Sequence, residues 1–234
     1  MIFAAGLGTR FKPWTDKHPK ALAIINGKSL LQRTVEYLQQ YDIHEIVVNV
    51  HHLAEQVEDA IEKNKGWGSH IQISNERDEL LDTGGGLLKA KELIGNETFL
   101  TVNVDILTDM NVKYFLSMHQ QQQGIITLAV TDRDTSRYLI FNKYGRLCGW
   151  RNKSTGEEKI VIHAPDLFER AYSGIAIFEP SVFDLIPFTG KFSLIDLYLA
   201  LALQNKVAEF NHTGDKLIDV GKAENAMVAE QMFL

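Results

Sequence analysis

Short β-branched runs alternate with amphipathic stretches over the first hundred residues, and this alternation constrains the fold more than any other feature. The run 45–50 is typical of a strand buried on both faces. Apolar residues at helical spacing predict helices over 30–41 and around 54–61. Alternation of this kind favours βαβ units, so the sequence predicts an α/β fold with a mostly parallel sheet. Further strands are expected at 1–3, 71–74 and 99–105.

The second half of the chain continues with mixed elements. The polar, glycine-containing stretch 151–159 predicts a mobile loop. Because no linker or internal repeat separates the halves, we expect one domain over residues 1–234. Helices are expected at 111–123, 194–204 and 222–232. Strands are expected at 125–131, 138–141, 147–150, 171–178, 207–210 and 216–221.

Composition excludes several classes of partner. A formal charge of −6 leaves no broad basic surface for nucleic acid. No apolar run reaches the roughly 20 residues of a membrane helix, so no membrane partner is expected. The single cysteine, Cys148, permits no internal disulfide and fits a reducing compartment, where we expect a packed thiol. The prediction is a cytoplasmic protein, with its state as monomer or homodimer left open.

A glycine-rich segment follows the first predicted strand. Gly6 and Gly8 let the backbone approach a ligand closely and offer N–H groups to phosphate oxygens. Arg10, Lys12 and Lys20 add positive charge nearby. The segment therefore predicts a polyphosphate site.

Three other interpretations of these glycines compete with a polyphosphate site. A Rossmann dinucleotide loop needs a third glycine where Phe11 stands, and an acidic residue that 22–31 lacks. A Walker A loop needs Gly-Lys-Ser/Thr after four spacers, which is absent. A plain tight turn remains open for a lone Gly-x-Gly.

A second glycine cluster stands at 82–87, and it predicts a loop opening into a helix. Such a helix start can take an anion or let a flat base lie against backbone; a flexible turn is the alternative. Asp105 ends the run 99–105, and ligands bind beyond the carboxyl ends of parallel strands. Asp105 is therefore the candidate metal ligand, preferred over Asp109 because the strand ends there.

Other chemistry-bearing residues give weaker signals. His51 and His52 lack a third ligand at metal-site spacing, so a structural role is preferred. The pattern assigns no role to Glu76. It also indicates no Ser/His/Asp or Cys/His catalytic group.

The pattern Ala-Ala-Gly-x-Gly-Thr-Arg-x-x-Pro-x-Thr over 4–15, followed by Pro-Lys-x-Leu at 19–22, resembles the signature of the nucleotide-sugar pyrophosphorylases, the sugar-1-phosphate nucleotidyltransferases. Two departures are Val104 in place of the family's glycine before Asp105, and 25–29 in place of a proline-containing turn. The resemblance implies a three-layer, Rossmann-like mixed, mostly parallel sheet of nucleotide-diphospho-sugar transferase type. It also implies a nucleotide-binding half at about 1–110 and a sugar-binding half at about 111–234.

The resemblance implies a role for each site residue. Arg10 would clamp the departing β,γ-phosphates, and Lys20 would bind the α-phosphate and the sugar phosphate. Asp105 and Asp219, the latter in Ile-Asp-Val-Gly, would hold Mg²⁺. The nucleotide-binding residues would be Ala5, Gly6, Gly8, Thr9, Arg10, Thr83, Gly84, Gly85 and Asn103. The sugar-binding residues would be Ser173 and Gly174.

The compact length resembles the N-acetylmuramate-1-phosphate uridylyltransferases of cell-wall recycling. The expected partners are therefore an NTP, best UTP, and a sugar-1-phosphate, with Arg137, Arg151 and Lys153 as candidate cations for the muramate carboxylate. GTP-dependent mannose- or heptose-1-phosphate guanylyltransferases are the alternative. A non-catalytic nucleotide-sugar sensor and a Rossmann oxidoreductase are less favoured. Because family members usually carry a longer first strand, a few residues are also expected before Met1.

Overall fold

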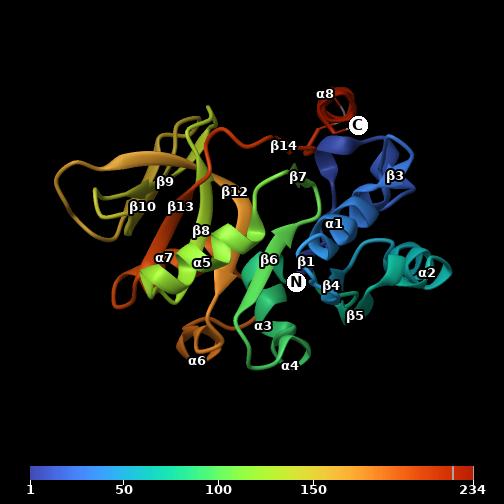
Figure 1. Cartoon of the computed structure of the whole chain (residues 1–234), viewed down its shortest axis with the longest axis horizontal. Helices are drawn as coiled ribbons and strands as arrows, with labels where there is room; N and C mark the ends of the chain where they lie inside the picture. The colour runs from blue at the N-terminus through green and yellow to red at the C-terminus, as the bar shows by residue number, and fades with distance from the viewer. Residues whose placement is uncertain (223, 234) are drawn as a thin grey trace.

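A parallel sheet forms the centre of the first half of the chain. The computed structural model describes residues 1–222 and 224–233. Strands β1 (Ile2–Phe3), β4 (Glu45–Val50), β5 (His70–Asn75) and β6 (Phe99–Asn103) lie in the order β6-β1-β4-β5, all parallel (Figure 1). The predicted parallel arrangement is confirmed.

Alternate residues of these strands supply two apolar clusters, one on each face of the sheet. Ile2 and Val48 belong to the cluster that includes α1 (Leu30–Gln39), α2 (Ala54–Lys63) and α5 (Val112–Gln122). Phe3 and Val47 belong to the cluster that includes α3 (Asp82–Lys89) and α7 (Leu194–Ala202). Because successive strand residues point to opposite faces, the β-branched runs fill both cores. The result is a helix–sheet–helix arrangement.

Strand β12 (Phe168–Phe178) joins the second half to this sheet. It runs antiparallel to β6, with Ile175 opposite Val102, and antiparallel to β8 (Ile126–Thr131). β13 (Val207–Asn211) then pairs parallel with β8. From β5 to β13 only β12 runs against the others, so this part of the sheet is mixed and mostly parallel.

The predicted mobile loop at 151–159 is wrong. Strands β9 (Arg137–Phe141), β10 (Leu147–Asn152) and β11 (Glu157–Ile160) form an antiparallel extension instead. Arg151 stands opposite Glu158 and pairs with it, and its Nη1 lies 2.5 Å from Glu169 Oε1. Ion pairs on an exposed edge strand replace the apolar alternation on which strand prediction relies.

The predicted loop at 82–86 is also wrong, because α3 already begins at Asp82 and Gly84, Gly85 and Gly86 lie inside it, all buried. The N–H groups of Gly84 and Gly85 donate to Phe192 O at 2.9 and 3.2 Å. A Cβ on Gly84 would overlap the Phe192 ring, and one on Gly85 would overlap Gly190 O. The glycines let a crossing segment lie directly on the helix.

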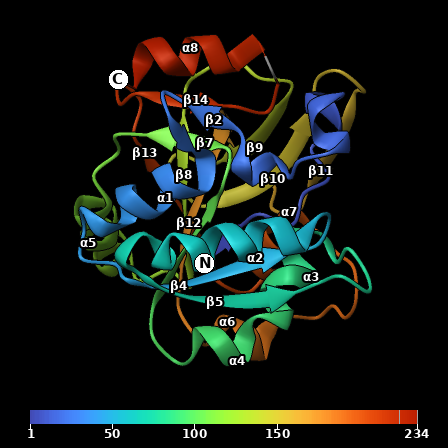
Figure 2. The ribbon, with the colours of Figure 1, turned by 90° about the vertical axis from the view of Figure 1, so that its right-hand side faces the viewer.

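Shorter elements complete the chain. β7 (Ile106–Thr108) and β14 (Leu217–Asp219) form an antiparallel pair, and α8 (Glu224–Met232) lies across β14 (Figure 2). The predicted helix at 222–232 includes residue 223, which lies outside the described residues. No helix in the described part of the chain is long and apolar enough to cross a membrane. The remaining elements are β2 (Ile24–Ile25), β3 (Lys28–Ser29), α4 (Lys91–Ile94) and α6 (Val182–Leu185).

Candidate active site

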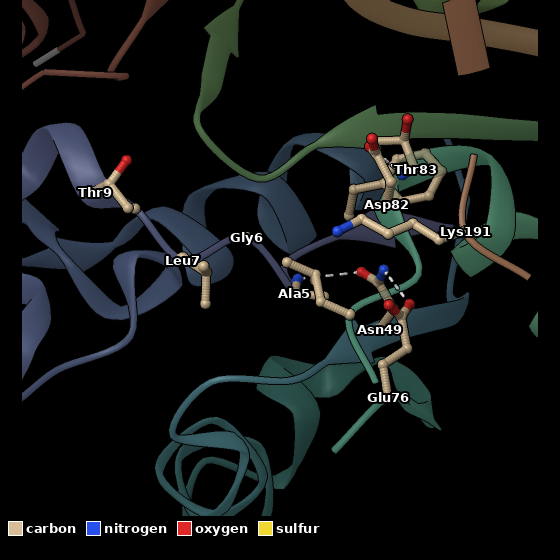
Figure 3. A pocket seen from close by; sticks show the side chains of 12 residues that line it. Ala5, Gly6, Leu7, Thr9, Asn49, Glu76, Asp82, Thr83 and Lys191 are labelled. Carbon is tan, nitrogen blue, oxygen red and sulfur yellow. Dashed lines mark hydrogen bonds between the residues drawn. The ribbon is translucent and has the colours of Figure 1, made fainter. Parts of the chain in front are cut away.

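Two adjoining cavities lie beyond the carboxyl ends of the central strands, and both contact the 6–9 loop and Thr83. The first, of about 360 Å³, is called the Leu80 cavity (Figure 3). The second, of about 280 Å³, is called the Arg10 cavity. Predicted residues lining one or both are Ala5, Gly6, Gly8, Thr9, Arg10, Lys20, Thr83, Asn103 and Asp105.

The glycine loop is held in place by Asn49, at the end of β4. Its Oδ1 accepts from Ala4 N at 2.7 Å and Ala5 N at 3.3 Å, and its Nδ2 donates to Glu76 Oε1 at 2.7 Å. Glu76 is fully buried and also accepts from Leu81 N at 3.2 Å. Glu76 therefore connects the loop to the start of α3, a role that no local pattern signals.

The two loop glycines serve different purposes. Gly8 has φ +60°, and a Cβ there would lie 2.9 Å from Thr15 Cγ2. The backbone conformation at this position therefore requires glycine. A Cβ on Gly6 would meet nothing within 4 Å. The backbone at Gly6 therefore faces open space in the cavity, as the polyphosphate prediction requires.

Asp105 and Asp219 are brought together by the β7–β14 ladder. Asp219 stands opposite Ile106, and Val220 N donates to Asp105 O at 2.8 Å. The buried Lys20 forms an ion pair with Asp105 Oδ2. Asp109, the competing candidate, instead accepts from Lys216 N at 2.7 Å. Of the two candidates, Asp105 is the one beside Asp219.

The electrostatics of this pair suit a divalent cation. Burial raises the pKa of Asp219, and the neighbouring negative charge of Asp105 raises it further, against the opposing charges of Lys20, Arg10 and Arg133. Asp219 Oδ1 is buried and has no hydrogen-bond partner among residues 1–222 and 224–233. An orphaned carboxylate oxygen beside a second carboxylate fits Mg²⁺, which takes one or two carboxylates together with substrate phosphates. No larger cluster of His, Cys, Asp or Glu suited to a metal occurs in the described residues.

Arg10 lies against Gly221, just after the end of β14. A Cβ on Gly221 would come within 2.6 Å of Asp219 Oδ1 and 2.8 Å of Arg10 Nη2. Residues 219 and 10 are far apart in sequence, and only a glycine at 221 leaves room for both the carboxylate and the guanidinium. Gly221 was not predicted, although it completes the Ile-Asp-Val-Gly pattern.

Arg133 is a further cation that sequence reasoning missed. It follows β8, its Nη2 donates to Tyr172 O at 2.7 Å, and burial lowers its pKa. Its positive charge favours the ionised form of Asp219 and so lowers the pKa of that carboxyl group. Nothing in the local sequence distinguishes it from a surface arginine.

The predicted sugar-binding residues Ser173 and Gly174 line neither cavity. Ser173 is fully buried and its Oγ lies 2.8 Å from His212 Nε2, while His212 Nδ1 lies 3.4 Å from Asp215 Oδ2. These contacts follow the order of a Ser-His-Asp catalytic group, which the sequence did not indicate. The Ser173 hydroxyl is buried, however, so a substrate cannot reach it. Gly174, at φ +73°, packs against Asn103, and a Cβ there would lie 2.8 Å from Asn103 Nδ2. A sugar-binding role for Ser173 and Gly174 stays a prediction.

The histidine pair has the structural role that was preferred. His51 Nδ1 donates to Glu76 O at 2.7 Å, and His52 Nε2 donates to Thr15 O at 3.2 Å. Both rings therefore bind backbone carbonyls that flank the glycine loop. Cys148 is buried, and burial raises the pKa of its thiol.

The fold and this site define a nucleotide-diphospho-sugar transferase. The chain matches the family model described as nucleotidyl transferase over residues 1–232. It therefore belongs to the nucleotidyl transferase family, as the loop and Asp patterns indicated, and it is an enzyme, a sugar-1-phosphate nucleotidyltransferase.

Individual relatives differ in their nucleotide and sugar. The chain is 31% identical over 230 residues to the N-acetylmuramate alpha-1-phosphate uridylyltransferase of Neisseria meningitidis, covering 94% of this chain and 92% of that protein. It is 25% identical to the mannose-1-phosphate guanylyltransferase catalytic subunit beta of Xenopus tropicalis, covering 100% of this chain but 64% of that protein. Among solved structures, HddC from Yersinia pseudotuberculosis superimposes with a TM-score of 0.81 at 24% identity, covering 100% of this chain and 98% of that one. That likeness shows the fold and confirms the predicted fold class.

Proposed function

We propose that this enzyme transfers a uridylyl group from UTP to N-acetylmuramate-1-phosphate, giving the UDP-sugar and pyrophosphate. The observation that carries the choice is the 31% identity to the Neisseria uridylyltransferase over nearly the full length of both chains. A sugar-phosphate oxygen attacks the α-phosphorus in line. As the new P–O bond forms, the bond to the α,β-bridging oxygen breaks, and pyrophosphate leaves with that electron pair. No side-chain nucleophile is needed.

Asp105 and Asp219 would hold Mg²⁺, which supplies charge neutralisation at the phosphates when it is bound. The orphaned Asp219 Oδ1 supports this assignment. Arg10, which lines the cavity beside Asp105, would present a fixed fork suited to the departing β,γ-phosphates. These charges compensate the repulsion between two anionic substrates.

Lys20 is the residue proposed to act on the reacting phosphate. It is 9% exposed, lines the Arg10 cavity and already pairs with Asp105. A buried ammonium that already pairs with a carboxylate would need little reorganisation as charge develops at the α-phosphate. Lys20 would bridge the α-phosphate and the sugar phosphate.

The muramate carboxylate needs a cation on the sugar side. Arg151 is paired with Glu158 and Glu169, and Lys153 with Glu169 at 2.6 Å. Among the described residues, the exposed Arg137 forms no side-chain ion pair. It is therefore the favoured candidate of the three, and Arg137→Ala should raise KM for N-acetylmuramate-1-phosphate without changing KM for UTP.

The alternative is a GTP-dependent mannose- or heptose-1-phosphate guanylyltransferase. It is supported by the similarity to the Xenopus guanylyltransferase and by the structure of HddC complexed with GMP-PN. A non-catalytic sensor is less favoured, because Arg10, Lys20 and Asp105 line one cavity and Asp219 lies beside Gly221 at its edge.

The test pairs UTP and GTP with N-acetylmuramate-, mannose- and heptose-1-phosphate, scored by pyrophosphate release. The expected result is the highest kcat/KM for UTP with N-acetylmuramate-1-phosphate. A clear preference for GTP would overturn the uridylyl assignment.

A further inference from the structure

Residues 190–193 cross over the start of α3, and we call this segment the strap. Phe192 N donates to Leu81 O at 3.2 Å, and Phe192 O accepts from Gly84 N and Gly85 N. Just after the strap, Leu194 N donates to Thr83 Oγ1 at 3.0 Å. All of the strap's own hydrogen bonds named here are made by backbone atoms, so they fix its position whatever side chain stands at 191.

The strap carries Lys191 to the Leu80 cavity. Lys191 lines that cavity, and its amine points toward the loop bearing Ala5 and Gly6 (Figure 3). It is the single cation among the residues that line the Leu80 cavity, and it has no hydrogen bond or ion pair to any of residues 1–222 or 224–233. Its charge is therefore available to a ligand.

Two carboxylates line the same cavity, those of Asp82 and Glu76. Asp82 Oδ1 accepts from Thr83 N at 2.6 Å. The two oxygens of Glu76 accept from Asn49 Nδ2 and Leu81 N. Within the described residues, neither acid forms an ion pair with Lys191, and both oxygens of Glu76 are held by other donors.

The two cavities differ in the charge of their lining residues, and this difference suits different parts of a nucleotide. The Arg10 cavity contains Arg10, Lys20 and Asp105, which suit a triphosphate with its metal. The Leu80 cavity adjoins it through the glycine loop and adds the apolar Leu7 and Leu80. An uncharged base on the same nucleotide therefore belongs in the Leu80 cavity, beside Lys191 and away from the phosphates.

We infer that Lys191 selects nucleotides by donating a hydrogen bond to a carbonyl oxygen of the base, favouring uracil and guanine over cytosine and adenine. This inference rests on the proposed nucleotidyl transfer and adds a residue that determines base specificity. Uracil O4 and guanine O6 accept hydrogen bonds, whereas cytosine N4 and adenine N6 donate them at the equivalent position. An ammonium has three donors and no acceptor, so an amino group opposite it stays unpaired.

The test measures binding and turnover of UTP, GTP, CTP and ATP with wild type and Lys191→Met. Methionine keeps the apolar stem and removes the charge. We expect affinity for UTP and GTP to fall about tenfold, the size of one hydrogen bond from a charged donor, with CTP and ATP unchanged. Lys191→Arg keeps a donor and should retain most of the selectivity. Lys143→Met, in the exposed β9–β10 turn, is the matched control and should change nothing.

Binding by calorimetry without a sugar phosphate separates this inference from the proposed function. If no tested sugar phosphate gives pyrophosphate, the proposed function fails while the selectivity of binding still reports on Lys191. An equal loss for all four nucleotides would show a phosphate or ribose contact and would overturn the inference. Unchanged affinities in Lys191→Met would overturn it as well.

Discussion

Gly6 and Gly85 both stand in glycine-rich segments but have opposite surroundings. A Cβ on Gly6 would meet nothing within 4 Å, whereas one on Gly85 would overlap the backbone oxygen of Gly190. One segment leaves room for a ligand, and the other leaves room for another part of the same chain. In both segments glycine allows another group to approach the backbone closely. Whether that group is a ligand or another segment of the chain depends on the tertiary structure.

The largest expected effect belongs to the ligand-facing region. Asp105→Asn or Asp219→Asn should lower kcat at least ~10²-fold, comparable to the loss of one key electrostatic stabiliser. Melting temperature should change little in Asp219→Asn, because Asp219 Oδ1 has no partner to lose among the described residues, whereas Asp105→Asn also removes the charge that pairs with Lys20. Near-normal turnover in either variant would refute the metal assignment.

The packed region should respond in stability instead. Gly85→Ala inserts a methyl group against backbone that cannot rotate away, so we expect a cost of about 1–3 kcal/mol or more. In a domain of this size that is a fall of roughly 2–4 °C in melting temperature per kcal/mol. Gly6→Ala is the matched control, expected to keep the melting temperature while weakening UTP binding. Reversed outcomes for the two variants would break the comparison.

Local periodicity predicted most elements of the first half, because helices such as α1 and strands such as β4 bury residues at regular spacing. The joint presence of Asp105 and Asp219 in one site was predicted only by resemblance to a family. The anchor at Glu76, the cation Arg133 and the Lys191 strap were missed. Each depends on partners distant in sequence, and no local pattern encodes such contacts.

The raised pKa of Asp219 should make activity depend on pH, with a smaller effect than the substitutions above. Burial and the charge of Asp105 raise its pKa, and the metal requires the ionised form. As pH falls, kcat/KM should therefore decline at a pH above the ordinary aspartate range near 4. Raising the Mg²⁺ concentration should move this acid limb to lower pH. A profile flat down to the ordinary aspartate range would contradict the burial argument.

The smallest effect is expected where Glu169 of β12 pairs with the β10–β11 hairpin. Hydrogen bonding to Lys153, followed by Arg151, lowers the pKa of Glu169 despite an opposing effect of burial. A lowered acid pKa stabilises the fold above the unfolded pKa, and this contribution is lost as pH falls through the folded value. Because the partners are largely exposed, Glu169→Gln should cost about 0.2–1 kcal/mol by denaturant titration at pH 7, and nothing at pH 2. An equal cost at both pH values would show that packing, not charge, is responsible.

The most direct test of the whole account is the stoichiometry of products by mass spectrometry. Incubated with UTP, N-acetylmuramate-1-phosphate and Mg²⁺, the enzyme should form one UDP-sugar for each pyrophosphate, and chelation of the metal should abolish both. Release of pyrophosphate with UMP and no sugar nucleotide, or product formation unchanged in excess chelator, would contradict metal-dependent nucleotidyl transfer at the Asp105–Asp219 site.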